Sequence, residues 1–271
     1  MTGREPNTFA GTELTRRHFL AGLSVATLAG VGLARCTVGA RPRVAQAATA
    51  PAPSPVVAAR RPLPGGALSS IPGDSNLLAL TLDDGVNTDV VRLYTQFAKD
   101  TGVRLTYFVN GTYRSWTQNR DLLRPLVESG QIQLGNHTWS HPDLATLPKG
   151  QVAEQLQRNH RFLMNNYGVD ARPYFRPPYG SHNPVVDAVA AELGYSMPTM
   201  WSGSLEDQNV IAEDEIVKMA NKYFHPQAIV IGHLNHLPVT HVYGQLVDVI
   251  RSRDLRTVTL DDVFAKPEQQ A

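Results

Sequence analysis

The chain has 271 residues, of which 42% are hydrophobic and 18% are charged, so it is long enough to bury one large core. These proportions exclude the collagen-like and disordered classes, and a single cysteine, Cys36, excludes a scaffold held by intramolecular disulfides. The formal net charge is +1, but six arginines and only two acids precede residue 48. The rest of the chain is therefore slightly acidic, which predicts no nucleic-acid binding.

The amino end, residues 1–47, has the pattern of an export signal. An arginine pair at residues 16–17 directly precedes an apolar stretch rich in glycine and alanine, residues 19–34, which is short for a membrane span. This order resembles a twin-arginine signal, and small residues at 45–47 offer a cleavage site. We therefore expect a protein exported across the cytoplasmic membrane of a bacterium, then secreted or associated with the cell wall. A permanent anchor and lipidation at Cys36 are the alternatives.

Residues 48–73 are rich in proline, alanine, glycine and serine. This composition favours an extended linker over packed structure. We therefore expect the folded, catalytic domain to occupy residues 74–271.

From residue 74 onward, apolar runs alternate with amphipathic helical stretches. Two late helices are expected at residues 213–223 and 243–250, and four earlier ones are expected to end at Gly102, Gly130, Gly168 and Gly194. The apolar runs predict strands at residues 77–82, 104–109, 131–134, 172–175, 195–201, 228–234 and 256–260.

Helices that stop at a glycine and pass directly to an apolar run indicate parallel strands joined by crossover helices. About seven such units fit a closed or nearly closed β/α barrel better than an open sheet. The expected fold class is therefore α/β, with a (β/α) barrel of about seven units. In a barrel and in an open parallel sheet alike, chemistry belongs at the carboxyl ends of the strands.

Two adjacent aspartates, Asp83 and Asp84, end the first strand in "LTLDDGVNT". They could simply cap the next helix, because aspartate is favoured at turns and helix starts. Three further polar clusters also follow predicted strands, and this coincidence favours a shared site over capping.

The second cluster, "GNHTWSHPD", contains His137 and His141. Imidazoles four residues apart on one helical turn project from one face and can share a metal, although a solvated or hydrogen-bonded pair is the alternative. Two imidazoles and one of the aspartates would leave an open position on a metal that activates water.

The third and fourth clusters supply an arginine and a histidine. Arg176, in "YFRPPYGSHN", could be a surface arginine, or its fork could orient one aspartate and keep it ionised as a base. His233, in "IVIGHLNH", could be a hydrogen-bonded structural histidine or a proton donor on the same rim.

All four clusters, in this order, resemble the motifs of the polysaccharide deacetylase family of the NodB type, called carbohydrate esterase family 4. The matching segments are "TLDDG", "HTWSH", "RPPYG" and "IGH", together with "RLTYFVNG" after the first motif, and the likeness spans about residues 77–264. The resemblance implies a distorted barrel. It also implies hydrolysis of N-acetyl groups on chitin-like or peptidoglycan sugars, or of O-acetyl groups on xylan.

The resemblance assigns the metal to three residues: Asp84, His137 and His141. It implies one divalent ion, zinc in the first place and cobalt or nickel otherwise. It leaves Asp83 off the metal as the base that takes a proton from the attacking water.

The same resemblance implies supporting roles around this centre. Arg176 would hold Asp83, and His233 would protonate the leaving amine. The backbone N–H of Tyr179 would stabilise the oxyanion, Ile231 would wall the pocket for the acetyl methyl group, and Trp201 would contact substrate.

The family's remaining motif, an aspartate followed by tryptophan, is altered here. In "WSGSLEDQN" we place the aspartate that orients the acid histidine at Asp207, with Gln208 where the tryptophan would stand. The change would remove an aromatic wall of the sugar groove.

The predicted function is that of an exported, metal-dependent hydrolase that removes N-acetyl groups from cell-wall or chitin-like glycans, acting as a monomer on acetylated polysaccharide. The alternatives are an O-acetyl esterase on xylan and a non-catalytic carbohydrate-binding relative, although a mere binder needs neither Asp83 nor His233. A metal-dependent phosphohydrolase would be expected to carry more carboxylate ligands.

Overall fold

The computed structural model describes residues 60–266. The predicted signal peptide at residues 1–47, the first part of the predicted linker at residues 48–59, and residues 267–271 lie outside the described part of the chain. Its strands are β1 (Leu77–Asp84), β2 (Leu105–Val109), β3 (Ile132–Asn136), β4 (Tyr174–Phe175), β5 (Met197–Pro198), β6 (Gly203–Ser204), β7 (Ile229–His233) and β8 (Arg256–Thr257). Its α-helices are α1 (Thr88–Thr101), α2 (Ser115–Gln118), α3 (Arg120–Glu128), α4 (Lys149–Tyr167), α5 (Pro184–Glu192), α6 (Glu213–Tyr223), α7 (Tyr243–Ser252) and α8 (Leu260–Val263). Short 3₁₀ turns are η1 (Leu144–Thr146), η2 (Pro178–Gly180) and η3 (Leu237–His241).

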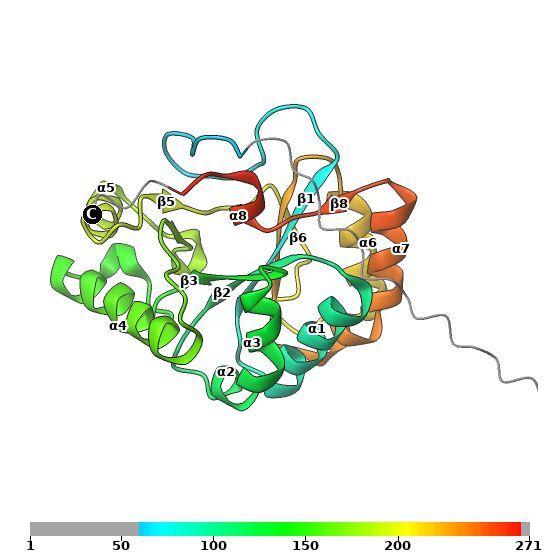
Figure 1. Cartoon of the computed structure of the whole chain (residues 1–271), viewed down its shortest axis with the longest axis horizontal. Coiled ribbons are helices and arrows are strands. Elements are labelled where there is room, and N and C mark those ends of the chain that lie inside the picture. The colour runs from blue at the N-terminus through cyan, green and yellow to red at the C-terminus, as the bar shows by residue number, and fades with distance from the viewer. Residues whose placement is uncertain (1–59, 267–271) are drawn as a thin grey trace, which may run out of the picture. The chain divides into compact units, whose positions relative to one another are not determined.

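The strands form one parallel sheet in the order β5-β4-β3-β2-β1-β7-β6, and β8 pairs with the start of β1. Figure 1 shows the helices arranged around the outside of this curved sheet. The architecture confirms the predicted α/β barrel of about seven units. Within residues 60–266 the sheet path ends at β5 on one side and at β6 on the other, so the barrel is distorted rather than fully closed.

The segment just before β1 pairs with residues next to β5 and β7. Leu68 forms a parallel bridge with Thr199, and Ser70 forms an antiparallel bridge with Ala228. Leu68 and Ile71 are each only 2% exposed. The expectation that the folded domain starts at residue 74 is therefore wrong for residues 60–73. Their prolines and glycines flank a short apolar stretch that fills the opening between the strands.

Strand β1 is central, and all eight of its residues are buried. Three alternate leucines of β1 are Leu78, Leu80 and Leu82. They belong to the larger core cluster, which also includes residues on the inner faces of the helices. Leu77 and Ala79 belong to the smaller cluster on the other face of the sheet. Because side chains alternate along a strand, Thr81 and Asp83 share the side of Leu77 and Ala79. The apolar run thus directs Asp83 into the barrel.

Most predicted helices are found where the sequence placed them. Gly102 and Gly168 are the C-caps of α1 and α4, and both are left-handed, as expected. Helices α3 and α5 end two residues before their predicted glycines, at Glu128 and Glu192. Strand β6 was not predicted, because two residues carry no periodic signal.

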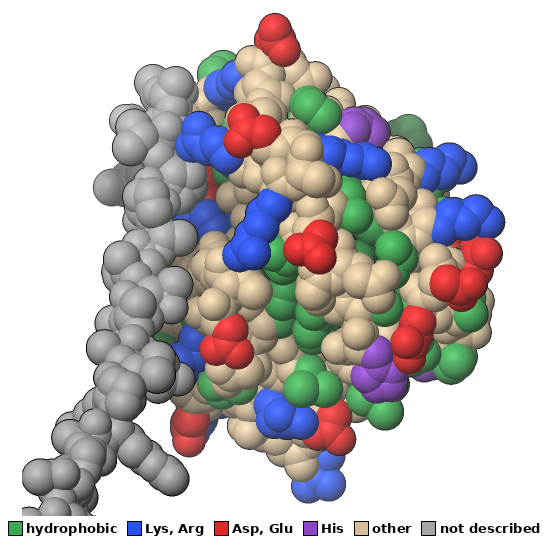
Figure 2. Space-filling view, turned by 90° about the vertical axis from the view of Figure 1, so that its right-hand side faces the viewer, with side chains coloured by type: hydrophobic (Ala, Val, Ile, Leu, Met, Phe, Trp, Pro, Cys, Tyr) green, Lys and Arg blue, Asp and Glu red, His purple; other side chains and the backbone are tan. Residues whose placement is uncertain are grey.

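Among residues 60–266, the structure has no helix with both the length and the apolar character needed to cross a bilayer. On the face shown in Figure 2, basic and acidic side chains are interspersed, and neither kind gathers into a large patch.

Candidate active site

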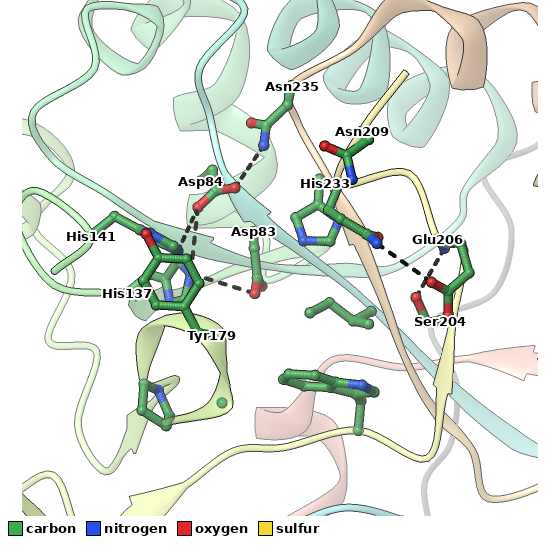
Figure 3. A pocket seen from close by; sticks show the side chains of 15 residues that line it. Asp83, Asp84, His137, His141, Tyr179, Ser204, Glu206, Asn209, His233 and Asn235 are labelled. Carbon is green, nitrogen blue, oxygen red and sulfur yellow. Dashed lines mark hydrogen bonds and ion pairs between the residues drawn. The ribbon is translucent and has the colours of Figure 1, made fainter. Parts of the chain in front are cut away.

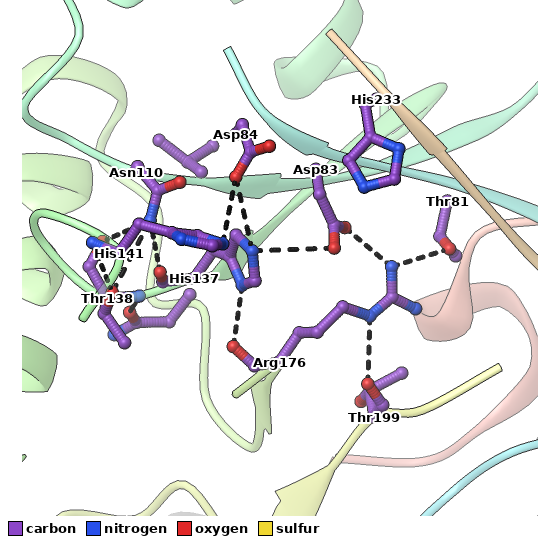
Figure 4. Close-up of polar contacts among 12 residues, drawn as sticks. Thr81, Asp83, Asp84, Asn110, His137, Thr138, His141, Arg176, Thr199 and His233 are labelled. Carbon is purple, nitrogen blue, oxygen red and sulfur yellow. Dashed lines mark hydrogen bonds and ion pairs between the residues drawn. The ribbon is translucent and has the colours of Figure 1, made fainter. Parts of the chain in front are cut away.

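The four polar clusters meet at the carboxyl ends of neighbouring strands. Asp83 and Asp84 end β1, His137 directly follows β3, Arg176 directly follows β4, and His233 ends β7. The aspartates and histidines line a pocket of about 450 Å³, and Arg176 is buried against Asp83; Figures 3 and 4 show these side chains. The structure thus brings all four clusters together at the strand ends, as the sequence predicted.

Three side chains form a candidate metal centre. Oδ1 of Asp84 lies 3.4 Å from Nε2 of His137 and 3.4 Å from Nε2 of His141, and the ligand atoms all lie within 4.8 Å of one another. Oδ1 of Asp84 is also buried without a hydrogen-bond donor. Such an oxygen is costly to bury unless a cation or donor meets it. An N,N,O set with this unpaired oxygen fits a divalent metal.

The charges of this centre stabilise its carboxylate. Burial alone would raise the pKa of Asp84, but the interactions with His137 and His141, together with the hydrogen bond from Asn235, outweigh burial and hold that pKa far below its usual range. Burial would likewise lower the pKa of His137, but the charges of Asp83 and Asp84 raise it. Burial and the neighbouring His137 lower the pKa of His141. The centre therefore concentrates negative charge beside two imidazoles.

The two imidazoles converge from a loop rather than from a helical turn, so that part of the sequence argument is wrong. Thr138 and His141 have left-handed backbones, with φ of 70° and 62°. The amide of His141 donates to Oγ1 of Thr138 at 3.1 Å, and the amide of Thr138 donates to Oδ1 of Asn136 at 2.9 Å. Side chains of the loop's own residues thus fold it back on itself, which spacing alone did not reveal.

Hydrogen bonds also orient His137. Its Nδ1 lies 2.7 Å from the carbonyl oxygen of Arg176, which can only accept, so Nδ1 carries the proton and Nε2 faces Asp84. The Nδ2 amide of Asn110 donates to the carbonyl of His137. Gln155 on α4 accepts from the amides of Trp139 and Ser140, at 3.0 and 2.9 Å. The sequence analysis missed these amide side chains, because asparagine and glutamine give no pattern of their own.

Asp83 forms a buried ion pair with Arg176. Nη1 of Arg176 donates to Oδ1 of Asp83 at 2.6 Å, and the two side chains are 0% and 3% exposed. The same nitrogen donates to Oγ1 of Thr81 at 2.9 Å, and Nε donates to the carbonyl of Thr199 at 2.9 Å. Arg176 is therefore not a surface arginine. Burial lowers its pKa, while the charge of Asp83 opposes that shift.

The turn after Asp84 requires glycine. Gly85 has a φ of 99°, and a Cβ at this position would lie 2.4 Å from the ring of Trp116. The indole N–H of Trp116 donates to the carbonyl of Asp84 at 3.1 Å, and Asp84 itself has a φ of 75°. A left-handed aspartate costs about 1 kcal/mol or more, so the surrounding contacts must hold it.

His233 is paired with Asp207 as expected for an oriented acid. Nδ1 of His233 lies 2.9 Å from Oδ1 of Asp207, and the His233 amide donates to Oδ2 at 3.2 Å. Burial alone would lower the pKa of His233, but the hydrogen bond and charge of Asp207 raise it. The pair therefore favours an imidazolium that can give up a proton.

The pocket wall includes the three residues expected to contact substrate: Tyr179, Ile231 and Trp201. Tyr179 is 72% exposed, has a φ of 60° and lies edge-on to His141 with ring centroids 4.5 Å apart. Gln208 also lines the pocket, beside Ser204, Glu206 and Asn209. This side of the pocket is therefore polar, in agreement with the expectation that the aromatic wall is absent here.

One residue at the site was not anticipated. Asn235, two positions beyond β7, donates from Nδ2 to Oδ2 of Asp84 at 2.7 Å. Its only sequence signal is its nearness to His233 in "IGHLNH".

Comparison with known proteins agrees with this geometry. Residues 70–198 match the model of the polysaccharide deacetylase family. A peptidoglycan-N-acetylglucosamine deacetylase from Listeria monocytogenes is 29% identical over 196 residues, which are 71% of this chain and 40% of that protein. The chain thus matches well under half the length of that relative.

Solved structures show the same fold. The chitin deacetylase from Colletotrichum lindemuthianum is 25% identical, covers 77% of this chain and 96% of its own, and has a TM-score of 0.67. A carbohydrate esterase family 4 pseudoenzyme from Bacillus anthracis is 22% identical, covers 75% of this chain and 72% of its own, and has a TM-score of 0.64. The fold is therefore shared by a deacetylase and by a pseudoenzyme.

Proposed function

We propose that the protein hydrolyses N-acetyl groups on a cell-wall or chitin-like glycan, because residues 70–198 match the model of the polysaccharide deacetylase family. The single observation that carries the proposal is the pairing of two aspartates with different partners at one pocket. Asp84 faces His137 and His141, whereas Asp83 is held by Arg176. One carboxylate is thus arranged to bind a cation, and its neighbour is arranged to accept a proton.

The cation-binding set consists of Oδ1 of Asp84 with Nε2 of His137 and His141. Two nitrogens and one oxygen suit zinc, and cobalt or nickel would bind the same set. When bound, such an ion polarises the acetyl carbonyl and makes water a stronger nucleophile at neutral pH.

Asp83 is the proposed base. As water attacks the acetyl carbonyl carbon, one water proton passes to the Asp83 carboxylate. The ion pair with the buried Arg176 fixes the orientation of that carboxylate. Since the other oxygen of Asp83 lies 3.5 Å from Nε2 of His137, the base stands directly beside the cation-binding set.

His233 is the proposed acid. With Nδ1 turned toward Asp207, its Nε2–H gives a proton to the amide nitrogen as the C–N bond breaks. The products are acetate and a free sugar amine. Figure 4 shows Asp83 between the two metal-facing histidines and His233, the order that water activation and amine protonation require.

The remaining proposed roles concern substrate placement. The backbone N–H of Tyr179 would donate to the developing oxyanion, and Ile231 and Trp201 would bound the space for the acetylated sugar. These residues line the same pocket as the proposed acid and base.

A non-catalytic role is the main competitor, since a pseudoenzyme shares the fold. Retention of the Asp83–Arg176 pair and of the His233–Asp207 pair supports catalysis, because binding sugar requires neither.

The test is acetate release by the purified full chain loaded with Zn²⁺ or Co²⁺, using chitooligosaccharide, peptidoglycan and acetylxylan, with Asp83→Asn as the blank. We expect release from one or both N-acetylated glycans. Release from acetylxylan alone would make the protein an O-acetyl esterase, and release from none of the three would contradict the proposal.

A further inference from the structure

Asn235 connects the end of β7 to the turn that carries Asp84. Its Nδ2 donates to Oδ2 of Asp84 at 2.7 Å, as Figure 3 shows. Its Oδ1 accepts from the amide of Val86 at 3.3 Å. One half-buried amide thus contacts both the side chain and the main chain of the same turn.

The two partners fix the orientation of this amide. An ionised carboxylate can only accept a hydrogen bond, and a backbone N–H can only donate one. Exchanging the nitrogen and oxygen of Asn235 would therefore break both contacts at once. The amide group matches its surroundings in one orientation only.

The backbone of the turn is also tied to the segment after β7. The amide of Leu234 donates to the carbonyl of Asp83 at 3.0 Å, and the amide of Asn87 donates to the carbonyl of Leu234 at 3.2 Å. These bonds hold the main chain but leave the Asp84 carboxylate free to rotate. Within the described residues, the only side chain that donates a hydrogen bond to that carboxylate is Asn235.

The two oxygens of Asp84 consequently have different surroundings. Oδ2 is occupied by Asn235, whereas Oδ1 is buried, faces both imidazoles and lacks a donor. We propose that Asn235 is a positioning residue that makes Asp84 a one-oxygen ligand and aims Oδ1 at the metal. A carboxylate that binds through one oxygen leaves more of the metal's positions open for water and substrate. This inference rests on the proposed metal-dependent function.

The test measures metal binding rather than turnover. Co²⁺ is titrated into the metal-free full chain and followed by visible absorption, and melting of the metal-free protein is recorded in parallel. For Asn235→Ala we expect the Co²⁺ dissociation constant to rise about 10- to 100-fold, the usual effect of losing a group that orients a ligand. The absorption spectrum should change as well, because the freed carboxylate can then bind through both oxygens.

Asn87→Ala is the matched control. Asn87 lies in the same turn and caps α1; its side chain accepts from the amides of Asp89 and Val90, and the hydrogen bond to Asp84 comes from Asn235 instead. Its loss should lower the melting temperature through the lost cap while changing the Co²⁺ dissociation constant less than about twofold. Asn235→Leu keeps the side-chain size, removes both hydrogen bonds and should reproduce the effect of alanine.

The outcomes separate the inference from the proposed function. Wild-type protein that binds no Co²⁺ would overturn both. Tight binding by the wild type with unchanged affinity and spectrum in Asn235→Ala and Asn235→Leu would overturn the positioning role alone. Equal weakening by Asn87→Ala and Asn235→Ala would show that general loosening of the turn, and not the Asp84 contact, sets the affinity.

Discussion

Asp83 and His233 are direct partners in the register of β1 and β7, two neighbouring parallel strands. The proposed base and the proposed acid are thus set side by side by backbone pairing, with no intervening loop to adjust. A slip of one residue would turn Asp83 to the opposite face of the sheet, away from Arg176. The apolar run that precedes Asp83 therefore determines on which face of the sheet the proposed base lies, as well as which residues form the core.

Removing one partner of the buried Asp83–Arg176 pair should strongly destabilise the protein. Replacing Arg176 by methionine leaves the Asp83 charge buried and unpaired, because the pair is 0% and 3% exposed. We expect the free energy of unfolding to fall by about 3–5 kcal/mol. Urea denaturation of the metal-free protein, followed by circular dichroism, measures the change.

Arg124→Met is the control for that prediction. Arg124 and Glu128 form an ion pair of similar length, 2.7 Å, but their side chains are 56% and 58% exposed. Loss of this pair should change the free energy of unfolding by less than about 1 kcal/mol. Comparable losses in the two variants would show that burial does not govern the Arg176 pair.

The sequence predicted the strand ends, and with them the meeting of the four clusters, because apolar runs and terminal glycines are local signals. It could not predict how His137 and His141 converge. The left-handed Thr138 depends on hydrogen bonds to Asn136 and His141, which form only once the loop is folded. Spacing singled out two histidines that do lie together beside Asp84, but it predicted the wrong local structure for them.

Two other features required tertiary structure. Residues 60–73 have the composition of a linker, yet Leu68 and Ile71 are buried because the barrel leaves an opening that they fill. Asn235 has no motif, and its role depends on the distance from β7 to the β1 turn. Composition and periodicity describe neither a gap between strands nor a contact between residues about 150 positions apart.

The pairing of His233 with Asp207 predicts a pH effect. The hydrogen bond and charge of Asp207 raise the pKa of His233 against the effect of burial. In Asp207→Asn the charge is lost, so that pKa should fall and the protonated acid should be lost at lower pH. The alkaline limb of the kcat/KM profile should therefore move to lower pH, as measured by acetate release across a pH series. An unmoved limb together with reduced activity would show that Asp207 acts only on structure.

We also propose that the amino end directs export by the twin-arginine route, a prediction that concerns residues outside the described part of the chain. Replacing both arginines at 16–17 by lysine keeps the charge but removes the paired signal, so the precursor should accumulate inside the cell. Arg41→Lys with Arg43→Lys is the control and should be exported normally. Immunoblots of cell and medium fractions measure both, and normal export of the first variant would contradict this route.

The division of work between the two aspartates makes the sharpest prediction. If Asp83 is the base, Asp83→Asn should retain the metal while lowering kcat by about 10²-fold or more, since an amide keeps the size of the carboxylate but accepts no proton at neutral pH. If Asp84 is the ligand, Asp84→Asn should lose the metal first, because a neutral amide oxygen is a poor ligand for zinc. Elemental analysis of each purified variant, paired with acetate release, measures the two effects separately.

The surroundings of the two side chains argue for this order. Oδ1 of Asp84 is buried without a donor between two imidazoles, whereas Oδ1 of Asp83 is already held at 2.6 Å by Arg176. A metal bound through Asp83 would have to compete with that buried guanidinium, and a base at Asp84 would leave both imidazoles without a carboxylate partner on the metal. If Asp83→Asn nevertheless releases the metal and Asp84→Asn keeps it, the two roles are exchanged and Arg176 instead orients a ligand.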